Sequence, residues 1–300
     1  MRRSSGLTLV EVQVALLLVL VVSAAALAFV ARGRAAHRSG ESLARLEEAL
    51  DAAFALLVDE IRLAGYLGLT PAGSIAEGAT PAGTPESAGL AVSGGCGQSL
   101  ALDPAAVTAA DGAWNAAAGL PLGCRPSPHG RQLAGTDVLV LRHGAASASM
   151  PAAGRLQLET NLRAARLVAD GVARFGATAR WHDLEVSVYY VSADATGRNG
   201  WPSLRRKRLV GGTRPAFQDE ELVAGISDLQ IEFGLDDQVD ANDAVDRWVS
   251  PAGAVAGGTL RALRLTLEAR SDIPEAGQPG RSRRKRVTRV IGLRNAGAGG

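Results

Sequence analysis

The chain has 300 residues, of which 47% are hydrophobic, 21% are charged and only 4% are aromatic. This composition excludes a disordered or fibrous protein, so we expect one head domain with an N-terminal extension. The formal net charge of +2 is too small to indicate a nucleic-acid partner or an acidic partner.

An uncharged segment occupies residues 12–31, in which Gln13 and Ser23 are the only strongly polar side chains. At 1.5 Å per residue, a helix of this length spans about 30 Å, the thickness of a bilayer's hydrocarbon core. The segment therefore predicts a membrane-spanning helix. The positive-inside rule does not orient it, because arginines lie before and after it: Arg2, Arg3, Arg32, Arg34 and Arg38.

Glu11 lies at the start of this hydrophobic segment, where an ionised carboxylate would cost about 3 kcal/mol if it were held at mid-membrane. Cleavage after Gly6 would create an α-amino group on Leu7, one helical turn before Glu11. This amine would then pair with Glu11 of the same chain or of an adjacent subunit. The alternative is a Glu11 side chain that stays hydrated near the cytoplasmic interface.

The run Gly6-Leu7-Thr8-Leu9-Val10-Glu11 resembles the prepilin cleavage and methylation motif of type IV pilins and type II secretion pseudopilins. The resemblance implies a leader over residues 1–6, a prepilin peptidase that removes it, and N-methylation of Leu7, where most family members have phenylalanine. An ordinary secretory signal peptide is the alternative, since residues 23–28 offer A-x-A cleavage sites. Glu11 argues against it, because signal peptides carry basic residues at this place.

Apolar residues recur at steps of three and four beyond the arginines, and they predict an amphipathic helix: Leu43, Leu46, Leu50, Phe54, Leu57, Ile61 and Ala64. A continuous helix from Leu7 to about Ala64 would be about 85–90 Å long. Residues 43–48 and 59–68 are similar to the PilW family of minor pilins. That family often has a cysteine where this chain has Leu69, so its disulfide pattern is not transferred.

Short apolar or alternating runs bounded by turn residues follow, and they predict strands at residues 138–142, 156–159, 184–191, 204–209, 229–233, 260–269 and 286–293. Segments within this region also look like PilW positions. The expected fold is α+β and pilin-like, with a leader (1–6), a membrane-spanning and assembly helix (7–31), an amphipathic extension (32–68) and an antiparallel β-sheet head (69–300).

Cys96 and Cys124 are the two cysteines of the chain. In an exported head their pairing would close a loop of roughly 29 residues and stabilise the fold by about 3.5 kcal/mol. Two unpaired thiols are the alternative.

An acidic loop carries oxygen ligands suited to Ca²⁺, and we take Asp236, Asp240, Asn242 and Asp246 as the candidate ligands. A solvated loop between two strands is the alternative, since the spacing does not fit an EF-hand. No other cofactor is expected.

Two basic runs, residues 205–208 and 281–286, raise the question of DNA binding. Charged side chains that protect edge strands explain them better, because no aromatic residues are interleaved, so nucleic acid is not an expected partner.

The recognisable catalytic motifs are absent from the sequence, including G-x-S-x-G, H-E-x-x-H and a P-loop, so we expect no enzyme. The sequence predicts a structural minor pilin that takes part in type IV pilus assembly. The resemblance implies placement at the pilus tip or in an initiation complex, a role in adhesion and twitching motility, and other pilins, the assembly platform and a tip adhesin as partners. It also implies residence in the inner membrane, with a periplasmic head, before the subunit joins a surface pilus. A minor pseudopilin and an adhesive or DNA-binding module are the alternatives.

Overall fold

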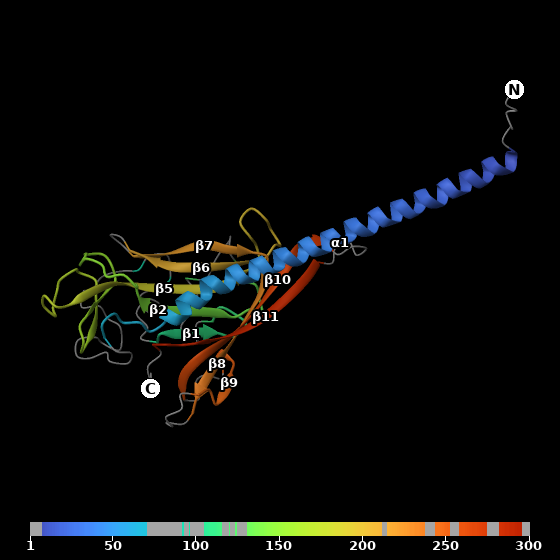
Figure 1. Cartoon of the computed structure of the whole chain (residues 1–300). Helices are drawn as coiled ribbons and strands as arrows, with labels where there is room; N and C mark the ends of the chain where they lie inside the picture. Colours follow the sequence, from blue (N-terminus) through green and yellow to red (C-terminus); the bar gives the residue numbers. More distant parts are fainter. Residues whose placement is uncertain are drawn as a thin grey trace. The chain divides into compact units, whose positions relative to one another are not determined.

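The computed structural model describes residues 8–70, 92, 96, 105–115, 120, 124, 131–211, 215–237, 244–252, 258–274 and 282–295. One helix and eleven strands lie in these residues (Figure 1). In chain order they are α1 (Leu9–Leu63), β1 (Val107–Ala110), β2 (Val138–Gly144), β3 (Gln157–Thr160), β4 (Ala165–Val168), β5 (Arg180–Ser192), β6 (Ser203–Val210), β7 (Ala216–Ala224), β8 (Ile226–Asp236), β9 (Arg247–Val249), β10 (Thr259–Pro274) and β11 (Ser282–Gly292).

The chain forms two compact units. The stalk unit comprises Met1–Arg45 with Ser271–Arg283, and the head unit comprises Leu46–Arg270 with Arg284–Gly300. The stalk unit therefore holds the first part of α1 together with the outer end of the β10–β11 hairpin. The head unit holds the rest of α1, the strands from β1 to β9 and most of β10 and β11.

Two antiparallel sheets make up the strand arrangement. The larger sheet has seven strands in the order β1-β2-β5-β3-β4, with β6 paired to β5 and β7 paired to β6. The 13-residue strand β5 is its centre, because β2, β3 and β6 all pair with parts of it. The smaller sheet has the order β11-β10-β8-β9.

Alternation along β2 and β5 divides the buried side chains of the larger sheet between its two faces. Leu139, Leu141 and Tyr189 pack with the residues of α1, whereas Val140 and Tyr190 belong to a second cluster on the opposite face. The second cluster also contains Trp114 and both cysteines. The sheet is thus covered on both faces.

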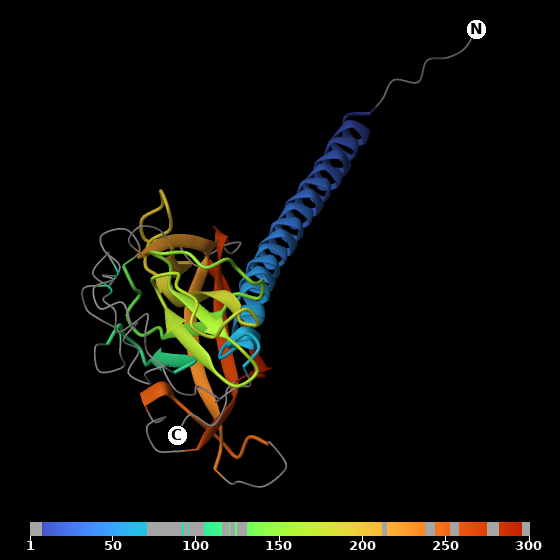
Figure 2. The same cartoon turned by 90° about the vertical axis from the view of Figure 1, so that its left-hand side faces the viewer.

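The second half of α1 packs its apolar stripe on the head unit. Leu46, Leu50, Phe54, Leu57 and Ile61 are each at most 2% exposed, and they share one core cluster with residues of both sheets. Figure 2, turned by 90°, shows this light-blue part of α1 beside the strands. The predicted amphipathic helix and the α+β, pilin-like fold are therefore confirmed.

α1 ends where glycines replace its apolar repeat. Gly65 has a φ of 77°, and a Cβ atom there would lie 2.4 Å from the backbone oxygen of Asn295. Only glycine fits this left-handed position and this close approach. Gly65 N–H then donates to Arg142 O at 2.9 Å, which directs the chain onto β2.

Each of the seven predicted strands is present, as β2, β3, β5, β6, β8, β10 and β11. The sequence analysis did not predict β1, β4, β7 and β9. Three of these are only three or four residues long, and β7 carries the polar run Gln218-Asp219-Glu220-Glu221. Such short or polar strands lack the apolar alternation on which the prediction depended.

Asp137, the residue directly before β2, joins the two sheets. Its N–H donates to Leu229 O at 2.9 Å, and its carboxylate accepts hydrogen bonds from Ile231 N at 2.7 Å and Gly112 N at 2.8 Å. Burial raises the pKa of this carboxyl to about 6, because the two N–H donors compensate only part of the lost hydration. The nearby carboxylates Asp111 and Asp228 raise the pKa further.

We expect Leu57→Ala to lower the free energy of unfolding by about 2–5 kcal/mol, because it leaves a cavity in the core shared by α1 and the sheets. Leu56→Ala is the matched control, since Leu56 is the preceding residue and is 42% exposed. Its effect should stay within about 0.5 kcal/mol. Urea unfolding of the full chain in detergent measures both variants. Equal effects of the two substitutions would contradict this packing.

The raised pKa of Asp137 predicts a pH-dependent stability. The folded state holds the proton more tightly than the unfolded state, so the contribution of Asp137 is most favourable below pH 4 and is lost as the pH rises through 6. The full difference is about 3 kcal/mol. The free energy of unfolding of the native chain, minus that of Asp137→Asn, should therefore fall between pH 4 and 7. A flat or rising difference would contradict the prediction.

Candidate assembly interface

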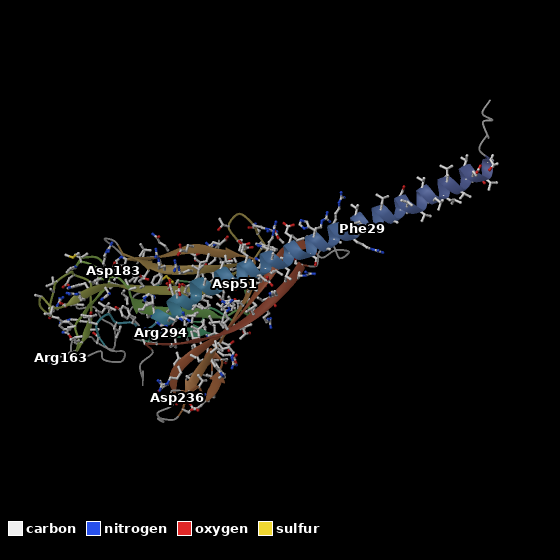
Figure 3. The ribbon with its side chains drawn as sticks, in the orientation of Figure 1. Phe29, Asp51, Arg163, Asp183, Asp236 and Arg294 are labelled. Atoms are coloured by element: carbon white, nitrogen blue, oxygen red, sulfur yellow. A yellow bond between two sulfur atoms is a disulfide. The ribbon has the colours of Figure 1, made fainter. Side chains whose placement is uncertain are left out.

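The N-terminal half of α1 exposes apolar side chains on all sides. The consecutive residues 16–20 are all leucine or valine and are 61–66% exposed, and at 100° per residue they point in every direction around the helix. Phe29 is 78% exposed, and Figure 3 shows its position along the helix. Water does not stabilise such a surface, so a bilayer or other apolar helices must cover it.

The mean hydropathy of α1 reaches 2.9 over an 18-residue window of which no part is buried. Within the described residues, α1 is the one helix that is long and apolar enough to cross a membrane. Its length and composition therefore suit a membrane anchor.

Glu11 lies in the first turn of α1, and its nearest partner is Thr8. The N–H and the hydroxyl of Thr8 both donate to Glu11 Oε2 at 3.0 Å, and Glu11 N–H donates to Thr8 Oγ1 at 3.4 Å. This reciprocal arrangement is a capping box, which satisfies N–H groups that the helix leaves unpaired. The T-x-x-E spacing carried this signal, and the sequence analysis missed it.

Gly6 and Leu7, the predicted cleavage and methylation positions, lie outside the described residues. The pairing of Glu11 with an amine on Leu7 therefore stays a prediction. The side chain of Glu11 is exposed, so its carboxylate is accessible to a further partner.

Within the stalk unit, the β10–β11 hairpin holds α1 just beyond its apolar half. Ser42 Oγ donates to Ser271 Oγ at 2.8 Å in a buried contact. Arg45 pairs with Asp272 at 3.1 Å, and Arg283 donates to the backbone oxygen of Ser39 at 3.2 Å. These contacts fix the axial position of the hairpin against the helix.

Within the head unit, Glu60 connects α1 to the larger sheet. Its carboxylate pairs with Arg206 of β6 at 2.5 Å, and both side chains are less than 20% exposed. Arg206 also pairs with Glu220 of β7 at 2.6 Å. A largely buried pair of this kind fixes the register of the helix on the sheet, because a shift would leave a desolvated charge unpaired.

The first basic run, residues 205–208 on β6, is divided between the two faces of the sheet. Arg206 faces α1, whereas Arg205 and Lys207 lie on the opposite face. Arg205 pairs with Asp219 at 2.7 Å and with Glu221 at 3.2 Å, and Lys207 donates to the backbone oxygen of Cys124. Alternation in a strand thus converts a continuous basic run in the sequence into separate, largely neutralised contacts.

The prediction that both basic runs protect edge strands is wrong for the first run. β6 lies between β5 and β7, so its charges pair with the acidic strand β7 across the sheet. The second run is on β11, which is an edge strand. There Arg284 and Arg286 pair with Glu268, and Lys285 pairs with Glu47 of α1 at 2.6 Å.

Two of the four candidate calcium ligands, Asp236 and Asp246, lie in the part of the chain that the structure describes. Asp236 is 4% exposed, and its Oδ2 accepts hydrogen bonds from Arg261 at 2.9 and 3.0 Å. Asp246 accepts a hydrogen bond from Asp237 N–H at 2.9 Å. Asp240 and Asn242 lie outside the described residues. A salt bridge to Arg261 already neutralises the carboxylate of Asp236, which lowers its value as a cation ligand.

Cys96 and Cys124 are joined in a disulfide, and both are fully buried in the cluster that covers the second face of the larger sheet. Trp114, in the same cluster, meets Tyr190 edge to face with ring centroids 6.0 Å apart. The disulfide therefore lies against the sheet and not at the surface.

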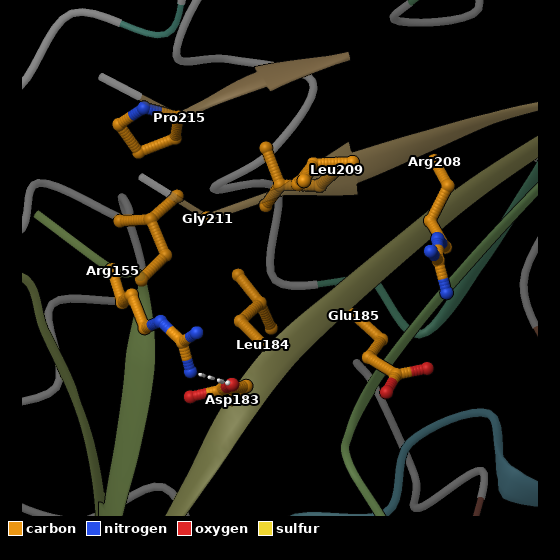
Figure 4. Close-up of a pocket in the computed structure, with 10 residues that line it drawn as sticks. Arg155, Asp183, Leu184, Glu185, Arg208, Leu209, Gly211 and Pro215 are labelled. Atoms are coloured by element: carbon orange, nitrogen blue, oxygen red, sulfur yellow. Dashed lines mark hydrogen bonds and ion pairs between the residues drawn. The ribbon is translucent and has the colours of Figure 1, made fainter. Parts of the chain in front are cut away.

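A shallow hollow of about 170 Å³ lies between β5 and the end of β6 (Figure 4). Leu156, Leu184 and Leu209 form its apolar lining, and an ion pair of 2.9 Å joins Arg155 to Asp183 at its edge. The lining residues include no serine, cysteine or histidine, so the hollow holds no Ser–His or Cys–His pair.

These features define a pilin-like α+β protein with an N-terminal helix suited to membrane anchoring. Residues 188–279, from within β5 to beyond β10, match a family model described as type IV pilus-assembly protein W (PilW). No curated protein and no solved structure matches the chain. The family match supports a protein that takes part in type IV pilus assembly.

Replacing both cysteines by alanine should lower the free energy of unfolding by about 3.5 kcal/mol, because the disulfide no longer restricts the unfolded chain. Denaturant unfolding of the oxidised full chain and of the double variant measures the difference. An unchanged midpoint would contradict a stabilising role of this disulfide.

Proposed function

We propose that this chain is a minor pilin-type subunit of a type IV pilus-like filament. The apolar half of α1 anchors it in the inner membrane with the head unit in the periplasm, and the same half packs among the helices of other subunits after assembly. The head unit is then displayed on the filament, at its tip or in the complex that initiates it. A structural role of this kind requires no cofactor and no catalysis.

One observation carries this proposal: a single helix has two halves with opposite surroundings. Residues 9–30 are exposed on all sides, whereas the stripe from Leu46 to Ile61 is buried in the head unit. A signal sequence that is removed does not need continuity with a core helix. A subunit that is first held in a bilayer and then in a helical bundle does need it, because the anchor must stay attached to the folded head.

Glu11 is the residue to which we assign subunit recognition. Its carboxylate is exposed and only partly engaged by Thr8. In our proposal, a prepilin peptidase cuts after Gly6, and the methylated amine of Leu7 in a neighbouring subunit pairs with this carboxylate. In the low-dielectric surroundings of packed apolar helices, such a pair is far stronger than in water.

N-terminal mass spectrometry of the mature protein tests the processing step. We expect a chain that begins at Leu7 and carries one methyl group on its amine. A chain that begins near Phe29 would reject the proposal, because it would have lost the apolar half of α1 as a signal peptide.

Glu11→Ala should reduce incorporation into filaments at least tenfold and leave the head folded, since it removes the charge partner but no core contact. Glu48→Ala is the matched control, because Glu48 is an exposed carboxylate of the same helix outside the apolar half. Quantitative immunoblotting of sheared filaments, with circular dichroism as a check of folding, measures both. Normal incorporation of Glu11→Ala would remove the role that we assign to this residue.

A minor pseudopilin of a type II secretion system is the other member of the same class. Deletion of the gene separates the two: we expect loss of surface pili with secretion intact. Loss of protein secretion with normal pili would assign the chain to the secretion system.

A further inference from the structure

Three arginines follow the apolar half of α1 immediately. Arg32, Arg34 and Arg38 are exposed, and they lie in the stretch between the last apolar residues and the first contact of the β10–β11 hairpin at Ser39. In the sequence they follow Phe29, whose place on α1 is labelled in Figure 3. None of these three side chains belongs to a core cluster of the described residues.

Within the part of the chain that the structure describes, no carboxylate pairs with these arginines. Between Glu11 and Glu41 the sequence contains no acidic residue, and Glu41 is already paired with Arg45 at 2.7 Å. Within the described residues, Arg32, Arg34 and Arg38 make no ion pair or side-chain hydrogen bond. The described residues therefore supply no partner, and the three guanidinium groups are accessible to one from outside the chain.

Depth along the helix indicates what surrounds them. If residues 12–31 fill the hydrocarbon core, the arginines begin at its far boundary and extend about 9 Å beyond it. This corresponds to the headgroup layer of one leaflet. Arginine side chains in this layer reach phosphate groups readily, because their aliphatic stems stay in the apolar region while the guanidinium group points outward.

The angular positions of the three arginines around the helix favour lipid over a single protein partner. At 100° per residue, Arg34 and Arg38 lie about 40° apart, whereas Arg32 lies about 160° from Arg34. A neighbouring helix contacts one stripe and would leave part of this ring unpaired. Lipid headgroups surround the helix and can meet all three side chains.

We propose that Arg32, Arg34 and Arg38 form a binding collar for the phosphate groups of anionic phospholipids on the periplasmic side of the inner membrane. The proposal rests on the membrane insertion of α1 put forward above. Guanidinium groups bind phosphate oxygens in a bidentate manner, so arginine suits this role better than lysine. The collar sets the depth of the anchor and holds the subunit in the membrane until assembly.

Native mass spectrometry of the full chain, released from nanodiscs with equal amounts of phosphatidylglycerol and phosphatidylethanolamine, tests the collar. We expect the native chain to retain the anionic lipid in clear excess. Each arginine should contribute about fivefold to this preference. The triple variant Arg32→Gln, Arg34→Gln and Arg38→Gln should therefore lower the preference about 100-fold, to near the ratio of the bulk lipids.

The control is a variant with the same loss of charge in the head unit, with glutamine at the exposed positions Arg131, Arg163 and Arg294. It should keep the native lipid preference. Equal preferences of the native chain and the collar variant would overturn the proposal. Reduced filament incorporation with unchanged lipid preference would also overturn it, and would assign the arginines to a subunit contact. Loss of the preference in the presence of millimolar inorganic phosphate would assign the site to free phosphate.

Alkaline extraction of membranes distinguishes failure of the collar from failure of the proposed function. If the native chain resists extraction but shows no lipid preference, only the collar is wrong. If the native chain is released by alkali, α1 is not inserted, and the proposed anchoring fails as well.

Discussion

The burial of one stripe of α1 against both sheets is the interaction on which the rest of this structure depends. Leu46, Leu50, Phe54, Leu57 and Ile61 share a single core cluster with strands of the larger and the smaller sheet. Because burial of apolar area is the main favourable term in folding, this stripe fixes the second half of the helix. The first half has no such partner within the described residues, and its apolar side chains are exposed.

The charged residues of α1 also differ between its two halves. In the head unit, Glu60 meets Arg206 of β6, and the exposed pairs of Glu47 with Lys285 and of Asp51 with Arg289 flank the apolar stripe. The exposed pairs add little stability, but they favour one register of helix on sheet. At the other end, Glu11 and the three arginines have no counter-charge within the described residues. Exposed charges therefore flank the apolar half of the helix on both sides.

Several elements were predictable from local pattern. The apolar segment, the amphipathic repeat and the alternating strand β10 each carry their periodicity in the sequence, and Gly65 marks the helix end. β7 was missed because its polar residues Asp219, Glu220 and Glu221 become favourable only opposite the arginines of β6. Its stability depends on a cross-strand partner, which no local pattern reveals.

The sequence by itself determined that α1 is long, apolar in its first half and amphipathic in its second, because both properties follow from spacing along one helix. It also contained the T-x-x-E box at Thr8 and Glu11. Only the tertiary structure decided how the basic run of β6 is used, since alternation sends Arg206 to Glu60 and Arg205 to Asp219 on opposite faces. The tertiary structure likewise pairs Asp236 with Arg261. These outcomes depend on which strands become neighbours, and that choice is made by burial over the whole fold.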